Sequence, residues 1–126
     1  MGVRIGSLEI NETEKFRLIS DSTYDWEEWR GPLGELVYIS PSCERITGFP
    51  VQDFISQENF LATIIHPDDI ADYQKNFSLS LIASTETSQL DFRIIRKNGE
   101  ERWINQYCVP IYHENGTWMG RRISNR

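Results

Sequence analysis

The stretch LDFRIIRKNGEERWI, residues 90–104, decides the fold of this chain. Its first half alternates apolar and polar side chains, as in a β-strand with one buried face. The pair Asn98-Gly99 is a strong signal for a tight turn between antiparallel strands, because both residues tolerate a positive φ. We therefore expect a β-hairpin, in which a second strand, Glu101–His113, returns beside the first.

The length of this turn decides which side chains face the core. A two-residue turn would pair Ile94 with Trp103. A three-residue loop, with Gly99 in the left-handed region, would instead pair Ile94 with Arg102. A shift of one residue moves every side chain of the returning strand to the other face, so the two registers predict opposite inner faces.

Outward from the hairpin, three more strands and a group of helices are expected. The chain turns back at Glu114-Asn115-Gly116 into a last strand, Thr117–Ser124. Nearer the N-terminus, the aromatic residues of Ser22–Arg30 and the apolar run Leu36–Ile39 predict a second hairpin around a Gly/Pro turn. Two strands, several helices and three strands indicate an α+β fold. We expect a five-stranded antiparallel sheet with the helices packed on one face.

Caps and apolar spacing place the helices. In chain order we expect Glu12–Ser20 capped by Asn11, Pro41–Thr47 capped by Ser40, Asn59–Ile65, and a long helix after His66-Pro67-Asp68-Asp69. Along the long helix, Ile70, Tyr73, Phe77 and Leu81 recur at spacings of three and four. The stripe predicts a helix of about 15 residues.

The composition excludes several classes of protein. The chain has 126 residues, with 13 Lys+Arg against 19 Asp+Glu and a net charge of −6, which fits one acidic domain. Without a cluster of Lys and Arg, nucleic acid is not an expected partner. No apolar run approaches the ~20 residues of a membrane span. Cys43 and Cys108 lack zinc-site spacing, and we expect two buried thiols in a reducing compartment.

The sequence contains no recognisable catalytic constellation. His66 precedes a proline at a helix start, and His113 lies at a turn. Asp68 and Asp69 are adjacent in a first helical turn, where carboxylates act as capping groups. We therefore expect that this segment is not an enzyme and holds no metal.

An ordered set of motifs resembles PAS sensor domains. The motifs are YISPSCERITGF at 38–49, HPDD at 66–69, FRIIRKNGE at 92–100, RWI at 102–104 and GRRISNR at 120–126. In addition, DWEEW at 25–29 resembles a subgroup common in prokaryotic multi-PAS sensor kinases. The resemblance implies the PAS fold, a five-stranded antiparallel sheet with a helical crossing segment. It divides the chain into a flexible segment with a capping helix, residues 1–21, and the PAS domain, residues 22–126.

The resemblance also implies a function and a set of partners. It indicates a sensory input and dimerisation domain of a signal-transduction protein, a sensor histidine kinase of a two-component system. The chain stops at Arg126, before the Asp-Ile-Thr-like motif that usually ends the family's last strand, so we expect a piece of a longer protein. We expect a homodimer, a downstream kinase or other output domain, and a cytoplasmic location in a soluble or membrane-attached parent. The alternative is a ligand-free structural or protein-interaction module.

Known cofactor-binding PAS subclasses have residues that this chain lacks. The flavin-binding type carries a reactive cysteine in an Asn-Cys-Arg-Phe-like motif, whereas Cys43 follows Ser42 and precedes Glu44. The haem-binding type has a histidine inside the long helix, and residues 70–84 contain none. We therefore expect neither flavin nor haem, and an unknown small ligand remains the candidate.

The resemblance favours the three-residue loop, which also pairs Phe92 with Ile104 and turns Gln106 inward. The expected pocket lining is Tyr38, Ile46, Tyr73, Phe77, Phe92, Ile94, Ile104, Gln106, Cys108 and Arg122. Gln106, with Arg122, would bind a polar or anionic ligand such as a carboxylate. In the alternative, Gln106 satisfies a backbone group and Arg122 pairs with an acid.

The same register turns Trp103 and Tyr107 outward. Exposed aromatic side chains in a row mark a surface that is covered in the assembled protein. Phe16 and Ile19 of the N-terminal helix, or a second protomer, would supply the cover. We therefore expect a homodimer, or at least docking of that helix.

Overall fold

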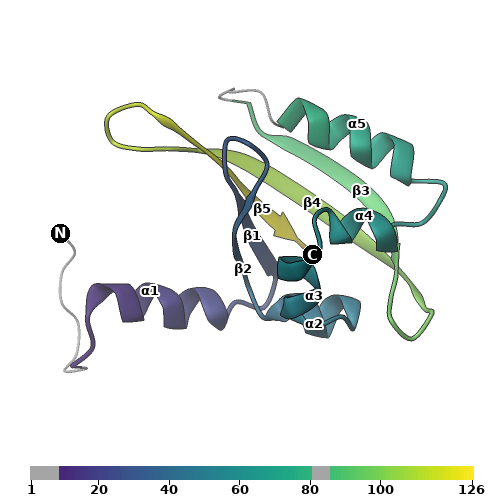
Figure 1. Ribbon diagram of the computed structural model, residues 1–126, viewed down its shortest axis with the longest axis horizontal. Coiled ribbons are helices and arrows are strands. Elements are labelled where there is room, and N and C mark those ends of the chain that lie inside the picture. The colour runs from purple at the N-terminus through teal and green to yellow at the C-terminus, as the bar shows by residue number, and fades with distance from the viewer. Residues whose placement is uncertain (1–8, 81–85) are drawn as a thin grey trace.

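A computed structural model of the chain describes residues 9–80 and 86–126. In chain order the elements are α1 (Glu12–Asp21), β1 (Trp26–Arg30), β2 (Leu36–Ile39), α2 (Ser42–Thr47), α3 (Val51–Ser56), α4 (Phe60–Ile64), α5 (Ile70–Ser80), β3 (Ser88–Ile95), β4 (Glu101–Tyr112) and β5 (Trp118–Asn125). The strands form one antiparallel sheet in the order β2-β1-β5-β4-β3, and α1 projects away from it (Figure 1). The expected α+β fold is confirmed. Residues 1–8 of the expected flexible segment lie outside the described residues.

The hairpin between β3 and β4 has the three-residue loop. Gly99 adopts φ +89°, and its N–H donates to the carbonyl of Arg96 at 2.8 Å. Ile94 therefore pairs with Arg102, and the register continues along both strands to Ser88 and Cys108. We call the face that carries Ile94 the inner face and the opposite one the outer face.

The inner face and the helices enclose the core. Trp26 on β1 is fully buried and meets Phe54 of α3 edge to face, with ring centroids 5.4 Å apart. Phe54 meets Phe60 of α4 at 4.9 Å. On the other side of the core, Tyr73 of α5 packs on Phe92 of β3 at 5.3 Å. These contacts place α3, α4 and α5 over the inner face.

A bulge in β5 sets which of its side chains turn inward. Gly120 adopts φ +100°, and a Cβ there would lie 2.0 Å from the carbonyl oxygen of Arg30, so β5 passes β1 closely only with glycine. The register between β4 and β5 shifts between Pro110 and Tyr112. Beyond the bulge, Arg121 faces inward and Arg122 faces outward.

The segment before α5 is fixed to β3 by a charged contact. The Asp69 carboxylate accepts from the backbone N–H of Arg93 at 2.7 Å and from its guanidinium at 2.9 Å through both Nε and Nη2. These hydrogen bonds hold the pKa of Asp69 at about 2, below its usual range. His66 accepts from the N–H of Asp68 at 3.1 Å, and its Nε2 lies 3.0 Å from Oε1 of Glu101. Asp69 thus joins α5 to β3, and its expected role as a helix cap is wrong.

Two other local expectations need correction. Ser40 does not cap α2, because its Oγ accepts the N–H of Glu27 at 2.8 Å and α2 begins at Ser42. The helix α5 is described to Ser80, and the predicted continuation to Leu81 lies outside the described residues.

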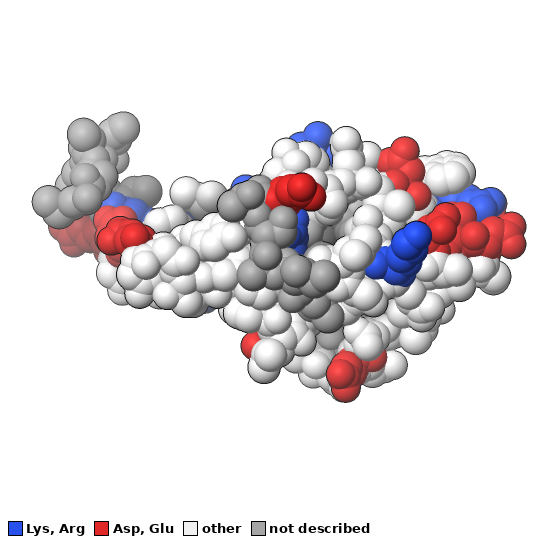
Figure 2. Space-filling model, turned by 90° about the horizontal axis from the view of Figure 1, so that it is seen from above, with Lys and Arg blue, Asp and Glu red and all other residues white. Residues whose placement is uncertain are grey.

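Acidic and basic side chains are interspersed on the face seen in Figure 2. Within residues 9–80 and 86–126, no helix is long and apolar enough to span a bilayer.

Candidate functional site

The inner face of the sheet carries polar side chains where a core usually has apolar ones. The strands β1, β5 and β4 lie side by side, and their inward residues alternate with outward ones. The buried polar and charged residues on these strands are Glu28, Gln106, Arg121 and Asn125. Buried polar groups are costly unless they are hydrogen-bonded, so their contacts determine what this face can do.

Three of these side chains, together with that of Arg30, form a continuous chain of hydrogen bonds across three strands. Arg30 Nη2 donates to Glu28 Oε1 at 3.0 Å. Asn125 Nδ2 donates to Glu28 Oε2 at 3.5 Å, and Gln106 Nε2 donates to Asn125 Oδ1 at 3.0 Å. We call Arg30, Glu28, Asn125 and Gln106 the buried polar chain. It links β1 to β4 through β5.

Glu28 is the acid of the buried polar chain. Glu28 is only 2% exposed. Burial raises the pKa of its carboxyl, and the nearby Arg30 opposes this effect by lowering that pKa. Burial also raises the pKa of the Tyr73 hydroxyl, and the negative charge of Glu28 raises it further. The same two causes raise the pKa of the Cys43 thiol to about 12. Both groups therefore stay neutral near Glu28, and Arg30 is its charged partner on β1.

A second guanidinium lies on the inner face beside Arg30. Arg121 is directly opposite Arg30 in the β1–β5 pairing. Its Nε donates to Sγ of Cys108 at 2.9 Å, and its Nη2 donates to the backbone carbonyl of Glu86 at 2.6 Å. Among the described residues, the charged groups at inward positions of β1 and β5 are therefore two guanidiniums and one carboxylate. This balance favours a negatively charged guest over a positively charged one.

A groove of about 600 Å³ opens from solvent toward Arg30. It runs between the β1–β2 connection and the α3–α4 segment, and Phe77 of α5 contributes to its wall. Its lining consists of Arg30, Leu33, Gly34, Glu35, Leu36, Phe54, Ile55, Ser56, Gln57, Glu58, Asn59 and Phe77. We call it the lateral groove. Its volume is in the range of small-molecule pockets, roughly 300–1,000 Å³.

The structure brings most of the predicted pocket residues together on the inner side. Ile46, Tyr73, Phe92, Ile94, Ile104, Gln106 and Cys108 are buried, and Phe77 packs against the core. Two of the predicted residues lie elsewhere. Tyr38 pairs with Trp29 on the outer face, where its hydroxyl donates to Asp21 at 2.9 Å. Arg122 is also outward, with Nη2 3.3 Å from Glu27 Oε1, because the bulge at Gly120 turns Arg121 inward instead.

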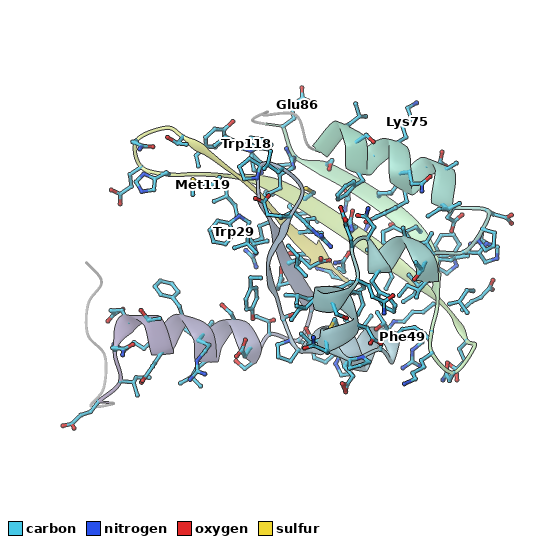
Figure 3. All side chains as sticks on the ribbon, in the orientation of Figure 1. Trp29, Phe49, Lys75, Glu86, Trp118 and Met119 are labelled. Carbon is cyan, nitrogen blue, oxygen red and sulfur yellow. The ribbon has the colours of Figure 1, made fainter. Side chains whose placement is uncertain are left out.

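Sequence reasoning missed Glu28, Arg30, Arg121 and Asn125. The signal for two of them was present, because Trp26, Glu28 and Arg30 share one face of an alternating strand. Trp26 and Trp29, three residues apart on β1, face opposite sides of the sheet. Trp29 lies on the outer side of β1, and its Nε1 donates to the carbonyl of Met119 at 2.8 Å (Figure 3).

Apolar side chains are exposed both on the outer face of the sheet and on α1. Trp103 is 62% exposed and Tyr107 39%, and both turn outward as expected. On α1, Phe16 and Ile19 are 71% and 69% exposed, and no residue of the helix is buried. A second groove of about 600 Å³ lies between these α1 residues and the β1–β2 side of the sheet. The helix therefore flanks the outer face without covering Trp103.

Comparisons with known proteins agree on one family. A family model described as the PAS fold matches residues 36–120. The chain is 30% identical over 81 residues to the White collar 2 protein of Neurospora crassa, covering 64% of this chain and 15% of that protein. It is 26% identical over 106 residues to the methyl sulfide methyltransferase-associated sensor of Methanosarcina acetivorans, covering 83% of this chain and 10% of that sensor. The chain thus spans a small part of these two relatives.

The fold of a solved structure is also similar. A PAS domain of a protein from Colwellia psychrerythraea superimposes with a TM-score of 0.69 and 22% identity, covering 92% of this chain and 96% of that one.

Proposed function

This chain belongs to the PAS family, and we propose that it binds a small molecule on the inner side of its sheet. It is a PAS sensory domain. In the full-length protein it would act as the cytoplasmic input domain of a sensor histidine kinase. The DWEEW motif at 25–29 supports this parentage, as does the likeness to part of a much longer sensor.

The observation that carries the proposal is the contact between the lateral groove and the buried polar chain. Arg30 lines the groove and also binds Glu28, so a molecule in the groove would reach the hydrogen bonds of the inner face. From Glu28 the hydrogen bonds continue to Asn125 on β5. Binding would shift the population between two arrangements of this strand, which is how a bound molecule changes an output.

Native mass spectrometry tests the binding. Protein purified under native conditions is expected to carry an added mass that denaturation releases, or to gain thermal stability from a component of a metabolite library. Ligand-free protein without stabilisation by any component would contradict the proposal. It would favour the alternative, a structural or protein-interaction module.

A second role, self-association, is favoured by the exposed apolar outer face. We propose that Trp103 and Tyr107 of one copy are covered by the α1 helix of a second copy, through Phe16 and Ile19. Large exposed apolar patches on a small domain mark such interfaces, and two-fold dimers are the commonest assemblies. Light scattering is expected to give the mass of a dimer, whereas a monomer at high micromolar concentration would contradict this role.

The kinase parentage is tested separately. Fusing the domain in its natural frame to the downstream region encoded by its gene should give a protein whose autophosphorylation changes when the outer face or the groove is altered. A downstream region without a kinase would refute the parentage and leave the binding proposal intact.

A further inference from the structure

We propose that the lateral groove takes a small carboxylate, which competes with Glu28 for the guanidinium of Arg30 and leaves Glu28 to take up a proton. The inference rests on the proposed small-molecule function and assigns its ligand class and its coupling.

Arg30 is placed to bind an acid. Its Nη1 donates to the carbonyl of Gly34 at 3.3 Å and its Nη2 donates to Glu28 at 3.0 Å. A guanidinium has five N–H donors in a planar fork that matches a carboxylate in a bidentate geometry. Arg30 thus has donors beyond the two in these contacts and lines an open groove.

The walls of the groove fit an acid with an apolar body. Phe54 and Phe77 contribute aromatic surface, and Gln57 and Asn59 contribute polar groups. The two acids of the lining, Glu35 and Glu58, are both exposed, where water and salt screen their charge. The charge near Arg30 is decided by the inward groups of β1 and β5, which are Arg30, Arg121 and Glu28.

Glu28 is poised to change its protonation when Arg30 changes partner. Burial already raises the pKa of its carboxyl, and Arg30 is the cation that opposes this effect. The groups that face Glu28 from the other elements are Asn125 on β5, Cys43 on α2 and Tyr73 on α5. The amide, the thiol and the phenol carry no positive charge, so none of them replaces the guanidinium.

The proton balance of the step is simple. The bound ligand remains a carboxylate on Arg30, and the carboxylate of Glu28 takes one proton from solvent and becomes neutral. The number of buried negative charges near Arg30 is unchanged, which limits the desolvation cost of binding. The contact from Asn125 Nδ2 to Glu28 then loses its charged acceptor, and this change reaches β5.

Calorimetry with phenylacetate as the probe and phenylacetamide as its matched control tests the inference. We titrate the full chain at neutral pH in buffers of different ionisation enthalpy, because the slope of the observed enthalpy counts the protons taken up. We expect millimolar binding of phenylacetate with uptake of up to about one proton, and binding of phenylacetamide at least about tenfold weaker. Phenylacetate that does not bind, or binds without proton uptake, would overturn the inference.

Two variants locate the effect. Glu28→Gln keeps the shape of the side chain and is expected to bind phenylacetate with no proton uptake. Adding Arg30→Met in the Glu28→Gln background removes the guanidinium without leaving a buried carboxylate unpaired, and binding should weaken at least about tenfold. Proton uptake that persists in Glu28→Gln, or undiminished binding in the folded double variant, would overturn the inference.

The outcome separates this inference from the proposed function. If native mass spectrometry finds a bound molecule that is neutral or cationic, the sensory function stands and the carboxylate assignment fails. If it finds no ligand of any kind and phenylacetate does not bind, both fail.

Discussion

Asn125 of β5 donates through Nδ2 to Oε2 of Glu28, 97 residues earlier in the chain, at 3.5 Å in the buried interior. This contact joins the first strand of the sheet to the last. Glu28 in turn accepts a hydrogen bond from Arg30, which lines the lateral groove. A change at the groove is therefore two hydrogen bonds away from the end of β5.

Replacing Glu28 by Gln is expected to leave the free energy of unfolding at neutral pH equal to or above that of the wild type. Burial raises the pKa of Glu28 in the folded state above its ordinary value of 4.5, so the folded state holds the proton more tightly. The wild type should therefore gain stability from this group as the pH falls from neutral toward 4.5, and the variant should lack that gain. Urea unfolding across this pH range measures both effects. A variant that is strongly destabilised at neutral pH would contradict the account.

Replacing Asp69 by Asn is expected to lower Tm by several degrees at neutral pH, because its carboxylate accepts three hydrogen bonds from Arg93. The folded pKa of about 2 lies below the ordinary value of 3.8. The stability from Asp69 is therefore complete above 3.8 and lost as the pH falls toward 2, and the variant should lose less over that range.

Asp68→Asn is the matched control for Asp69. The Asp68 side chain is 76% exposed and lies 3.8 Å from Arg93. Its replacement should change Tm little, as is usual for exposed ion pairs. Equal losses at Asp68 and Asp69 in calorimetric melting would show that the Arg93 contact is not what fixes this segment.

Gly120→Ala should be far more damaging than Gly99→Ala, although both glycines have positive φ. At Gly99 no atom lies within 4 Å of an added Cβ, so the cost is the backbone strain alone, about 1 kcal/mol. At Gly120 the Cβ would meet the backbone oxygen of Arg30 at 2.0 Å, and the cost should exceed about 3 kcal/mol. Chemical denaturation measures the pair, and equal costs would mean that β5 does not approach β1 as closely as described.

Trp103→Glu is expected to weaken self-association at least about tenfold, because it places a charge in the apolar outer face. Leu33→Glu is the control, since Leu33 is 87% exposed on the β1–β2 connection. Sedimentation velocity over a range of concentrations compares the variants with the wild type. An unchanged dimer in Trp103→Glu would place the interface elsewhere.

The sheet and its main hairpin could be predicted because their signals are local. The alternation in residues 90–95, the left-handed glycine of the loop and the family resemblance together fixed the register of β4, and the structure has that register. The inward positions of Ile104, Gln106 and Cys108 follow from it. Buried residues of α2 and α5, such as Ile46 and Tyr73, were found from helical spacing.

Which side chains of β5 turn toward the inner face could not be predicted, because a bulge has no reliable local signature. The glycine that makes it, Gly120, is needed for its distance from the backbone of Arg30, a contact between residues 90 positions apart in the chain. Without knowledge of that contact, Arg121 and Arg122 are equally good candidates for the arginine that faces the inner side of the sheet. Glu28 and Arg30 were missed because acidic and basic side chains are usually exposed. Their inward position is visible only once β5 lies beside β1 and the helices pack on the inner face.

Asn125 and Arg30 provide the most direct test of the central claim that the groove communicates with β5. In a nitrogen–proton NMR titration with phenylacetate, we expect the Nε–H of Arg30 and the side-chain amide of Asn125 to shift together, with one apparent dissociation constant. Phenylacetamide should leave both signals in place. Resonances of Arg30 and Asn125 that do not move with phenylacetate, or that move with different dissociation constants, would contradict the account.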